Sequence, residues 1–573
     1  MENTTFADLY TPEGEALSGQ PWSVYPRPQL RRDSFLNLNG TWDFTLSASP
    51  EPPAEYDQNI LVPYAPQSLL SGLHQHCPED QWLFYRRRFT LPDGFRQARV
   101  LLHIGAADQI AAVTLNGMPV GEHIGGYESF TLDITKTLLD GENELIVRVL
   151  DEMSKEVLPY GKQSPKRGGM WYTPVSGIWQ TVWLESVPEE YVRALHIQTG
   201  ENWAEIKAEG VSAGLLTVHA PDGDVDVPLK DGRARVTFDE PRLWSPEQPY
   251  LYHFTLRSGD DLLHSYFALR TLSIRTVNGI SRLCLNGNPY FFHGILDQGY
   301  WSDGLFTPAA PVCYEKDILA MKSLGFNMLR KHVKVEPEQF YYDCDRLGMV
   351  VFQDMVNNGD YNFIRDTALP TVGWRHRPDH RMHRDPATRA AFWDGMEQTV
   401  RQLRNHPCIC CWTIFNEGWG QFEATKAYRR MKELDDTRFI DSISGWFKGG
   451  ENDVVSEHTY FRPFRPFKTN KPLVLSEFGG YTLTPVGHAF NPQKEYGYRH
   501  FETSESYEQA LVNLYESEII PAVSQGLCAA VYTQVSDVED EVNGLLSYDR
   551  KVCKATPARM QPVADALRKA IQG

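Results

Sequence analysis

The last three hundred residues alternate between short apolar runs and amphipathic stretches, and this alternation limits the possible folds most. Eight candidate strands follow one another: Tyr290–Ile295, Asn327–His332, Met349–Asp354, Ile409–Phe415, Phe439–Ser444, Val454–Tyr460, Leu473–Glu477 and Ala529–Gln534. Stretches with helical spacing lie between several of them: Tyr314–Leu324, Glu338–Leu347, Ala387–Arg404, Phe422–Leu434 and Tyr507–Ser524. Eight strands with intervening helices over about 300 residues are typical of a (β/α)₈ TIM barrel. We therefore predict such a barrel over residues 273–573.

The chain before the barrel has the short alternating strands of β domains. Candidate strands in residues 1–186 are Ala98–Ile104, Ala112–Leu115 and Glu144–Leu150, with a turn at Asn116-Gly117. This spacing predicts a jelly-roll sandwich. Residues 187–272 repeat the pattern in Gly214–His219, Ala234–Phe238 and Tyr252–Leu256, and their number suits an immunoglobulin-like sandwich. A chain of 573 residues also fits about three domains.

Charge and composition exclude several classes of partner. A net charge of −18 argues against nucleic acid or an anionic membrane surface as partner. The chain lacks an apolar run long enough to span a membrane, and its start lacks the features of a secretion signal, so we expect a cytoplasmic protein. Cys408, Cys410 and Cys411 are close in sequence, but alternation along a strand would split them between two faces. We predict that they are core residues, and we predict no metal or cofactor.

Two glutamates close two of the apolar runs. Asn416 and Glu417 follow Cys408–Phe415, and Glu477 follows Leu473–Ser476, each before glycine and aromatic residues. The carboxyl ends of barrel strands form the active-site face. For either glutamate alone, a structural role as a strand cap or as the partner of an arginine is as good an explanation as a catalytic role. Together they suit glycoside hydrolysis, in which one carboxyl group protonates the leaving oxygen and the other attacks or activates water.

The residues leading to Glu417 resemble glycoside hydrolase family 2, the family of β-galactosidases, β-glucuronidases and β-mannosidases. The family pattern appears as Arg404, Asn405, His406, Pro407, Cys408, Trp412, Asn416 and Glu417, with departures of similar size at Cys410, Cys411 and Thr413. The first region resembles the family's sugar-binding domain in Leu36–Phe44, Val113–Phe130 and Val175–Glu185. The resemblance implies a retaining exo-β-glycosidase that works by double displacement, with Glu417 as acid/base and Glu477 as nucleophile.

The resemblance also implies roles for residues at other strand ends. Asn416 would contact the sugar 2-hydroxyl, Tyr460 would hydrogen-bond the nucleophile, and Arg330 and His332 would lie beside it, although His332 also suits a core position. Trp419 would help make the site apolar enough to keep the acid protonated. Further candidates are His458, Asp354, Tyr532 as an aromatic platform, and Gln534. Trp171, Tyr172 and Trp179 are either site aromatics or sandwich-core residues.

The identity of the sugar is less constrained than the chemistry. Asp297 and Gln298 stand where β-galactosidases carry Arg-His, and Glu541-Val542-Asn543 stands where β-glucuronidases carry Asn-x-Lys. Arg462 and Arg465 follow Tyr460 and would suit a sugar carboxylate; the alternative is that they pair with acidic side chains.

These features leave several substrates open. They favour a β-D-galacturonide or β-D-galactoside, with a β-glucuronide as the alternative and a non-catalytic carbohydrate-binding protein as a further one. The role of the Trp374–Arg384 loop and the oligomeric state, with a homo-oligomer as one option, stay open.

Overall fold

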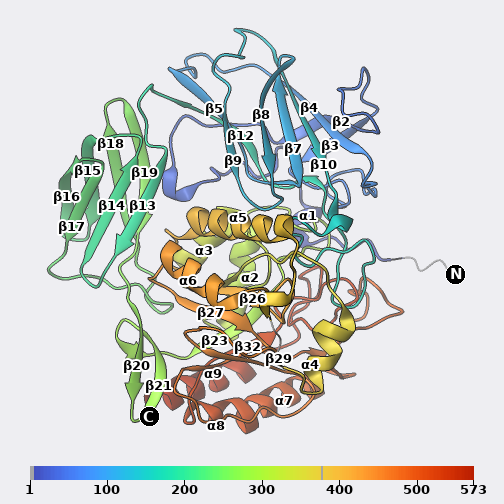
Figure 1. The fold of residues 1–573 in the computed structure, drawn as a ribbon, viewed down its shortest axis with the longest axis vertical. Coiled ribbons are helices and arrows are strands. Elements are labelled where there is room, and N and C mark those ends of the chain that lie inside the picture. Colours follow the sequence, from blue (N-terminus) through green and yellow to red (C-terminus); the bar gives the residue numbers. More distant parts are fainter. Residues whose placement is uncertain (1–5, 376–378) are drawn as a thin grey trace.

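The computed structural model describes residues 6–375 and 379–573. It has two β-rich regions and a barrel (Figure 1). The first β-rich region lies above the barrel in this view, and the second lies beside the first.

The first region consists mainly of two antiparallel sheets. The larger runs β3 (Gln58–Val62), β2 (Gly40–Ser47), β4 (Trp82–Phe89), β10 (Asn143–Leu150), β7 (Ile110–Leu115) and β8 (Met118–Ile124). The smaller runs β1 (Leu36–Asn37), β12 (Val182–Val187), β5 (Arg99–Ile104) and β9 (Phe130–Asp133), and β6 (Ala107–Asp108) pairs with β11 (Gly177–Ile178). Buried and half-buried residues alternate along β10. Its Val147 shares one core with Phe44 of the same sheet and Leu102 and Leu184 of the other.

The second region is one antiparallel sheet of seven strands. Its order is β13 (Ala194–Thr199), β14 (Trp203–Glu209), β17 (Arg233–Thr237), β16 (Gly223–Lys230), β15 (Ala213–Ala220), β18 (Tyr252–Ser258) and β19 (Asp261–Phe267). A three-stranded sheet, β20 (Leu272–Val277), β21 (Ile280–Leu285) and β22 (Asn288–Pro289), then leads into the barrel.

Eight parallel strands form the barrel. Their order is β27 (Phe439–Ser444), β26 (Ile409–Asn416), β25 (Val350–Asp354), β24 (Met328–Lys331), β23 (Phe292–Asp297), β32 (Leu527–Thr533), β29 (Leu473–Gly479) and β28 (Val455–Thr459). Strands β27 and β28, at the two ends of this order, also contact each other, which closes the sheet. The predicted barrel is thereby confirmed, and each predicted strand begins and ends within two residues of the observed one.

Helices flank the barrel strands: α2 (Val312–Ser323), α3 (Glu338–Leu347), α5 (Pro386–Leu403), α6 (Ala424–Leu434), α7 (Ser504–Leu514), α8 (Ile520–Val523) and α9 (Pro557–Gln572). Helix α9 is absent from the helices predicted from sequence, although Met560, Val563, Leu567 and Ile571 have helical spacing and are buried. Short elements complete the chain: α1 (Pro12–Glu15), α4 (Leu369–Thr371), β30 (Tyr481–Thr482) and β31 (Arg499–His500).

Two further predictions concern the three clustered cysteines and the absence of a membrane span. Cys408, Cys410 and Cys411 are buried and unpaired, and they belong to the barrel core. No helix in the described part of the chain combines the length and the apolar character that a membrane crossing requires.

A loop of the first region touches the catalytic end of the barrel. The backbone N–H of Tyr160 donates to the carbonyl of Asn357, in the loop after β25. Gly161 has a φ of +66°, and a Cβ there would lie 2.8 Å from the carbonyl oxygen of Val333. Only glycine permits both this backbone conformation and this close approach without strain. Residues 160–163 are therefore held against the end of the barrel where the candidate glutamates lie.

Candidate active site

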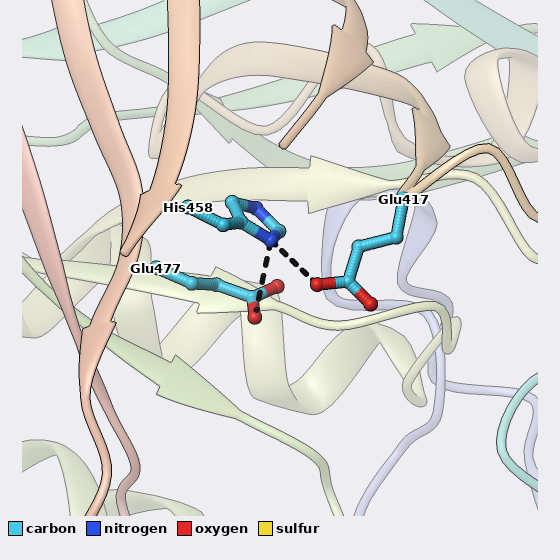
Figure 2. Close-up of side chains that lie close together, drawn as sticks. All are labelled: Glu417, His458 and Glu477. Carbon is cyan, nitrogen blue, oxygen red and sulfur yellow. Dashed lines mark hydrogen bonds and ion pairs between the residues drawn. The ribbon is translucent and has the colours of Figure 1, made fainter. Parts of the chain in front are cut away.

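Glu417 and Glu477 face each other at the carboxyl ends of β26 and β29. Figure 2 shows the imidazole of His458 between them. Its Nδ1 lies 2.8 Å from Oε1 of Glu417 and 3.5 Å from Oε2 of Glu477. One oxygen of each carboxyl group and this nitrogen all lie within 4.8 Å of one another. Strand β28, which carries His458, therefore brings a third polar group to the pair predicted from sequence.

The backbone turns sharply at Glu417. Its φ is +50°, in the left-handed region that residues other than glycine rarely adopt. The N–H of Glu417 still donates to the carbonyl of Ser444 on β27 at 2.9 Å, so the neighbouring strand fixes the turn. Gly418 follows with a φ of +77°, and a Cβ there would lie 2.3 Å from the ring of Phe447. Strained backbone of this kind is common at functional sites.

Arg330 on β24 joins four strands beneath the glutamates. Its Nε donates to Oδ1 of Asp354 at 3.0 Å, and its Nη1 donates to Oε1 of Glu477 at 3.0 Å. Its Nη2 donates to Oδ1 of Asn416 at 2.9 Å. Asp354 also contacts Nδ1 of His332 at 2.8 Å. The structure thus brings together Arg330, His332, Asp354 and Asn416, which were predicted from the ends of three strands.

The surroundings of Glu477 favour its charged form. Burial alone would raise the pKa of this carboxyl group, but the charges of His458, Arg330 and His332 and the hydrogen bond from Tyr460 lower the pKa to about 2. Arg330 remains cationic because Asp354 and Glu477 outweigh the effect of burial and raise the pKa of the guanidinium. Glu477 is therefore a carboxylate over the whole physiological range of pH.

Tyr460 binds the carboxyl oxygen of Glu477 that Arg330 does not bind. Its hydroxyl donates to Oε2 of Glu477 and lies 2.9 Å from the hydroxyl of Thr533. Its ring stacks on Tyr498 with centroids 4.1 Å apart. The sequence analysis did not find Tyr498, since it lies in a loop with no strand or motif to mark it.

Several buried donors at the site have no partner among the described residues. They are Nδ2 of Asn416, Nε1 of Trp419 and Nε1 of Trp446. Trp446 also went unpredicted, and its ring packs edge-on to His458 at 5.8 Å. Buried polar atoms are normally hydrogen-bonded, so donors left unpaired beside two glutamates indicate a site for a ligand rich in acceptors.

Tyr532 does not lie where the sequence predicted. The side chain is fully buried and packs against Phe478 and Tyr507 on the side of β32 that faces α7. Its neighbour Thr533 reaches Tyr460 instead. Tyr532 is therefore a core residue and not an aromatic platform for a sugar.

Gln534 belongs to a buried chain of hydrogen bonds. Its Oε1 accepts from Gln298 at 2.7 Å, and its Nε2 donates to Asn543 at 2.7 Å. Asn543 in turn donates to Oε1 of Glu541 at 2.9 Å, while Tyr172 of the first region donates to Oε2. Gln298, Glu541 and Asn543, at positions that depart from the patterns of galactosidases and glucuronidases, therefore belong to one hydrogen-bonded network.

Arg462 and Arg465, predicted at the rim of the sugar site, line a different hollow. It has a volume of about 440 Å³ and also includes Arg375, Glu457 and Thr459. His458 contacts both catalytic candidates, whereas its neighbour Glu457 binds Arg375 and Lys448. The hollow therefore lies on the opposite side of β28 from the glutamates, and this placement does not support contact of these arginines with a bound sugar. Residues 376–378 of the Trp374–Arg384 loop lie outside the described residues.

Aromatic and cationic side chains of the first region reach the barrel. Trp171 packs on Trp419 with ring centroids 5.4 Å apart, and Nζ of Lys162 lies 4.7 Å from the centre of the Trp419 ring. Trp179, by contrast, is fully buried between Tyr127 and Phe306. Lys162 had no signal in the sequence, because it precedes Glu417 by more than 250 residues.

Glu417, His458 and Glu477 also have the spacing of metal ligands. Two carboxylates and an imidazole are common ligands of divalent ions. Here, however, Arg330 already places a positive charge 3.0 Å from Glu477. This charge disfavours a second cation at the same carboxylate.

Three family models match the chain in succession. The galactose-binding domain-like model of glycosyl hydrolase 2 matches residues 67–216, a glycosyl hydrolases family 2 model matches 195–269, and the TIM barrel domain model of that family matches 277–558. Together the models cover most of the chain, including both glutamates.

Relatives and solved structures agree with these matches. A β-galactosidase of Thermoanaerobacter pseudethanolicus is 24% identical over 409 residues, a match that covers 66% of this chain and 50% of that protein. The β-D-glucuronidase structure of Dictyoglomus thermophilum has a TM-score of 0.71 at 18% identity and covers 95% of this chain and 98% of its own. A family 2 β-galacturonidase of Eisenbergiella tayi bound to galacturonate has a TM-score of 0.67 at 18% identity, with 96% and 99% covered. At these identities the two structures show the shared fold alone. The chain belongs to glycoside hydrolase family 2.

Proposed function

We propose that this glycoside hydrolase is a retaining exo-β-glycosidase that removes a terminal β-linked sugar by double displacement. Glu477 is the nucleophile and Glu417 is the acid/base. The observation that carries this proposal is the distance between the two carboxyl groups, whose nearest atoms lie within 4.8 Å. Retaining enzymes hold their carboxyl groups about 5 to 5.5 Å apart, whereas inverting enzymes leave about 6.5 to 9.5 Å for a water molecule.

The first step uses the two glutamates in opposite charge states. The carboxylate of Glu477 attacks the anomeric carbon while Glu417 gives its proton to the departing glycosidic oxygen. Arg330 and Tyr460 keep Glu477 ionised and aim its oxygens, and the low pKa of Glu477 fits this role. The product of the step is a glycosyl ester of Glu477 and a free aglycone.

The second step returns both groups to their starting state. Glu417, now a carboxylate, takes a proton from water, and the hydroxide attacks the anomeric carbon and releases Glu477. His458 contacts both carboxyl groups through Nδ1, so it can stabilise whichever of them carries the charge. Nδ2 of Asn416 has no hydrogen-bond partner among the described residues, so it can donate to the sugar 2-hydroxyl.

The substrate we propose first is a β-D-galacturonide or β-D-galactoside, with a β-D-glucuronide as the alternative. The buried Gln298–Gln534–Asn543–Glu541 chain occupies the region after β32 and places a carboxylate there. A carboxylate repels a uronate approaching from that side. Recognition of a uronate by the loop after β32 is accordingly disfavoured. A β-glucuronidase and a β-galacturonidase share this fold, so the fold does not distinguish a glucuronide from a galacturonide as substrate.

We also propose a division of the chain into three domains, which the order and the length of the strands support. Residues 1–186 form a jelly-roll domain, 187–272 an immunoglobulin-like domain and 273–573 the catalytic barrel. The order of the seven-stranded sheet from β13 to β19 corresponds to A-B-E-D followed by C-F-G, the two sheets of an immunoglobulin fold joined at one edge. The cytoplasmic location and a homo-oligomeric state stay predictions.

Four measurements test the mechanism and the substrate. Turnover of a panel of p-nitrophenyl glycosides identifies the sugar, and NMR of the first product formed should show the β anomer. A 2-deoxy-2-fluoro analogue of the best substrate should label Glu477, which mass spectrometry of the digested protein can locate. An α anomer as first product would contradict double displacement. Activity should survive treatment with EDTA, because no step requires a metal.

A further inference from the structure

Lys162 differs from the other buried lysines of the described chain. Lys331, Lys334 and Lys554 are each at most 2% exposed and each bind a carboxylate, at 2.6 to 2.9 Å. Lys162 is 7% exposed, and among the described residues its ammonium has no hydrogen bond or ion pair. Aromatic rings surround it, with Nζ 4.7 Å from the centre of the Trp419 ring and 6.0 Å from those of Trp171 and Tyr172.

The position of this ammonium is fixed from two sides. Gly161, the residue before it, fits against the barrel only without a side chain. The carbonyl of Lys162 accepts from the N–H of Tyr172. The ring beneath Nζ belongs to Trp419, two residues after Glu417, and this ring packs on His332 at 6.2 Å. A cation of the first region thus lies beside the catalytic residues of the barrel.

The surrounding charges leave this cation without a close counter-ion. Glu541 is a neighbouring acidic group: burial raises the pKa of its carboxyl group, and the charge of Lys162 offsets only part of that effect. Both oxygens of Glu541, however, already accept hydrogen bonds from Tyr172 and Asn543. Burying an unpaired ammonium is costly, and aromatic contacts offset only part of that cost. An anionic group of a ligand would supply the missing partner.

We propose that Lys162 binds the carboxylate of a terminal β-hexuronide and makes the enzyme prefer uronides to neutral hexosides. This inference rests on the proposed glycosidase function and narrows its substrate class. The charge that selects the substrate then comes from the first β region and not from the loop after β32, which presents the acidic side chain of Glu541. Arg462 and Arg465, on the far side of β28, have no part in it.

Lys162→Met tests the proposal because methionine keeps most of the apolar stem and removes the charge. We compare kcat/KM for the p-nitrophenyl β-D-galacturonide and β-D-glucuronide with that for the β-D-galactoside. The ratio of uronide to galactoside should fall by at least about thirtyfold, with partial rescue in Lys162→Arg. Lys166→Met is the matched control, since Lys166 is exposed on the same segment, and its ratio should stay within about twofold.

The possible outcomes separate the proposal from the underlying function. Equal losses on uronides and galactosides, no loss, or a selective loss in Arg462→Ala or Arg465→Ala would overturn the role of Lys162. A wild-type enzyme that prefers galactosides would also overturn the role of Lys162, but it would leave the glycosidase mechanism intact. The absence of turnover with every glycoside tested would contradict the glycosidase mechanism itself.

A binding measurement covers the case in which Lys162→Met does not fold. Calorimetry with the Glu477→Gln variant, which does not depend on turnover, should show binding of free galacturonate or glucuronate at least about tenfold tighter than binding of galactose. Equal affinities for the uronates and for galactose would contradict the proposal.

Discussion

Two buried histidine–aspartate pairs lie near opposite ends of the barrel strands, and they have different roles. Just before the start of β26, Nδ1 of His406 contacts Asp345 at 2.7 Å, and Asp345 also accepts from Tyr266 and from the N–H of Cys408. At the catalytic end, Nδ1 of His332 contacts Asp354 at 2.8 Å. The residue types, distances and burial of the two pairs are nearly the same.

The difference lies in where each network ends. The Asp345 network ends between the barrel and the second β region: both oxygens of Asp345 accept hydrogen bonds, and Nε2 of His406, which has no partner among the described residues, lies beside the ring of Tyr341. The Asp354 network continues through Arg330 to Glu477 and Asn416, and it ends in a donor of Asn416 with no partner among the described residues. Both networks include an unpaired atom, but only the Asp354 network ends beside the two glutamates, where an unpaired donor has capacity for a ligand.

Glu477→Gln should have the largest effect on activity. No covalent intermediate can form without the carboxylate, so we expect a loss of at least about 10⁴-fold in kcat with activated and unactivated substrates alike. The fold should remain, because glutamine keeps the shape and can still accept from Arg330. Circular dichroism and thermal unfolding check the fold, and substantial residual turnover would remove Glu477 from the role of nucleophile.

Glu417→Gln should have an effect that depends on the leaving group. Poor leaving groups need the proton that this residue supplies, so we expect a loss of about 10³-fold for a methyl glycoside and less than about tenfold for a dinitrophenyl glycoside. The two kcat/KM values give the test. If both substrates lose the same factor, the acid is another residue.

Tyr460→Phe should change the pH dependence of the reaction. The wild-type rate on a dinitrophenyl glycoside should show no acid limb from Glu477 above pH 4, because the pKa of Glu477 is about 2. Removal of the hydroxyl raises this pKa, so the acid limb of kcat/KM should move to higher pH by about one pH unit. An acid limb that stays at the same pH in Tyr460→Phe would show that the hydroxyl does not lower the pKa of Glu477.

The same carboxyl group links pH to stability. Its pKa in the folded protein is below the ordinary value of 4.5, so ionised Glu477 stabilises the fold above pH 4.5 and this contribution disappears as the pH falls toward 2.

Asp345→Asn should have the smallest effect on turnover. It disturbs the network just before the start of β26, so we expect a loss of about 1 to 3 kcal/mol in the free energy of unfolding. We also expect kcat to stay within about twofold at a temperature where the variant is folded. Denaturant unfolding and initial rates measure both quantities. A large loss of kcat in folded Asp345→Asn would erase the distinction between the two networks.

Sequence patterns alone determined the barrel and the position of both glutamates. Strand length, apolar runs and the glycines that end them are local properties, and the carboxyl ends of parallel strands must share one face. Glu417 and Glu477 follow from those properties. Arg330, His332 and Tyr460 also came from strand ends, with the help of the family resemblance.

Tertiary structure decided which side chains face the site. Strand β29 carries an extra residue relative to its neighbours: its pairing with β28 shifts between Glu457 and His458, and its pairing with β32 shifts between Leu475 and Phe478. A shift of one residue moves the following side chains to the other face, so counting along a strand cannot place them. Tyr532 was misplaced because it packs against Phe478 and Tyr507 on the side of β32 that faces α7, and the two arginines were misplaced because a loop carries them.

Tertiary structure also decided which distant residues meet. Lys162 and Trp171 reach Trp419 because a loop of the first β region is pressed against the barrel at Gly161. Nothing in the local pattern of residues 160–172 records that contact. The proposed reaction chemistry depends on two strand ends, which the sequence by itself could locate, whereas the proposed charge beside the sugar depends on how two regions pack.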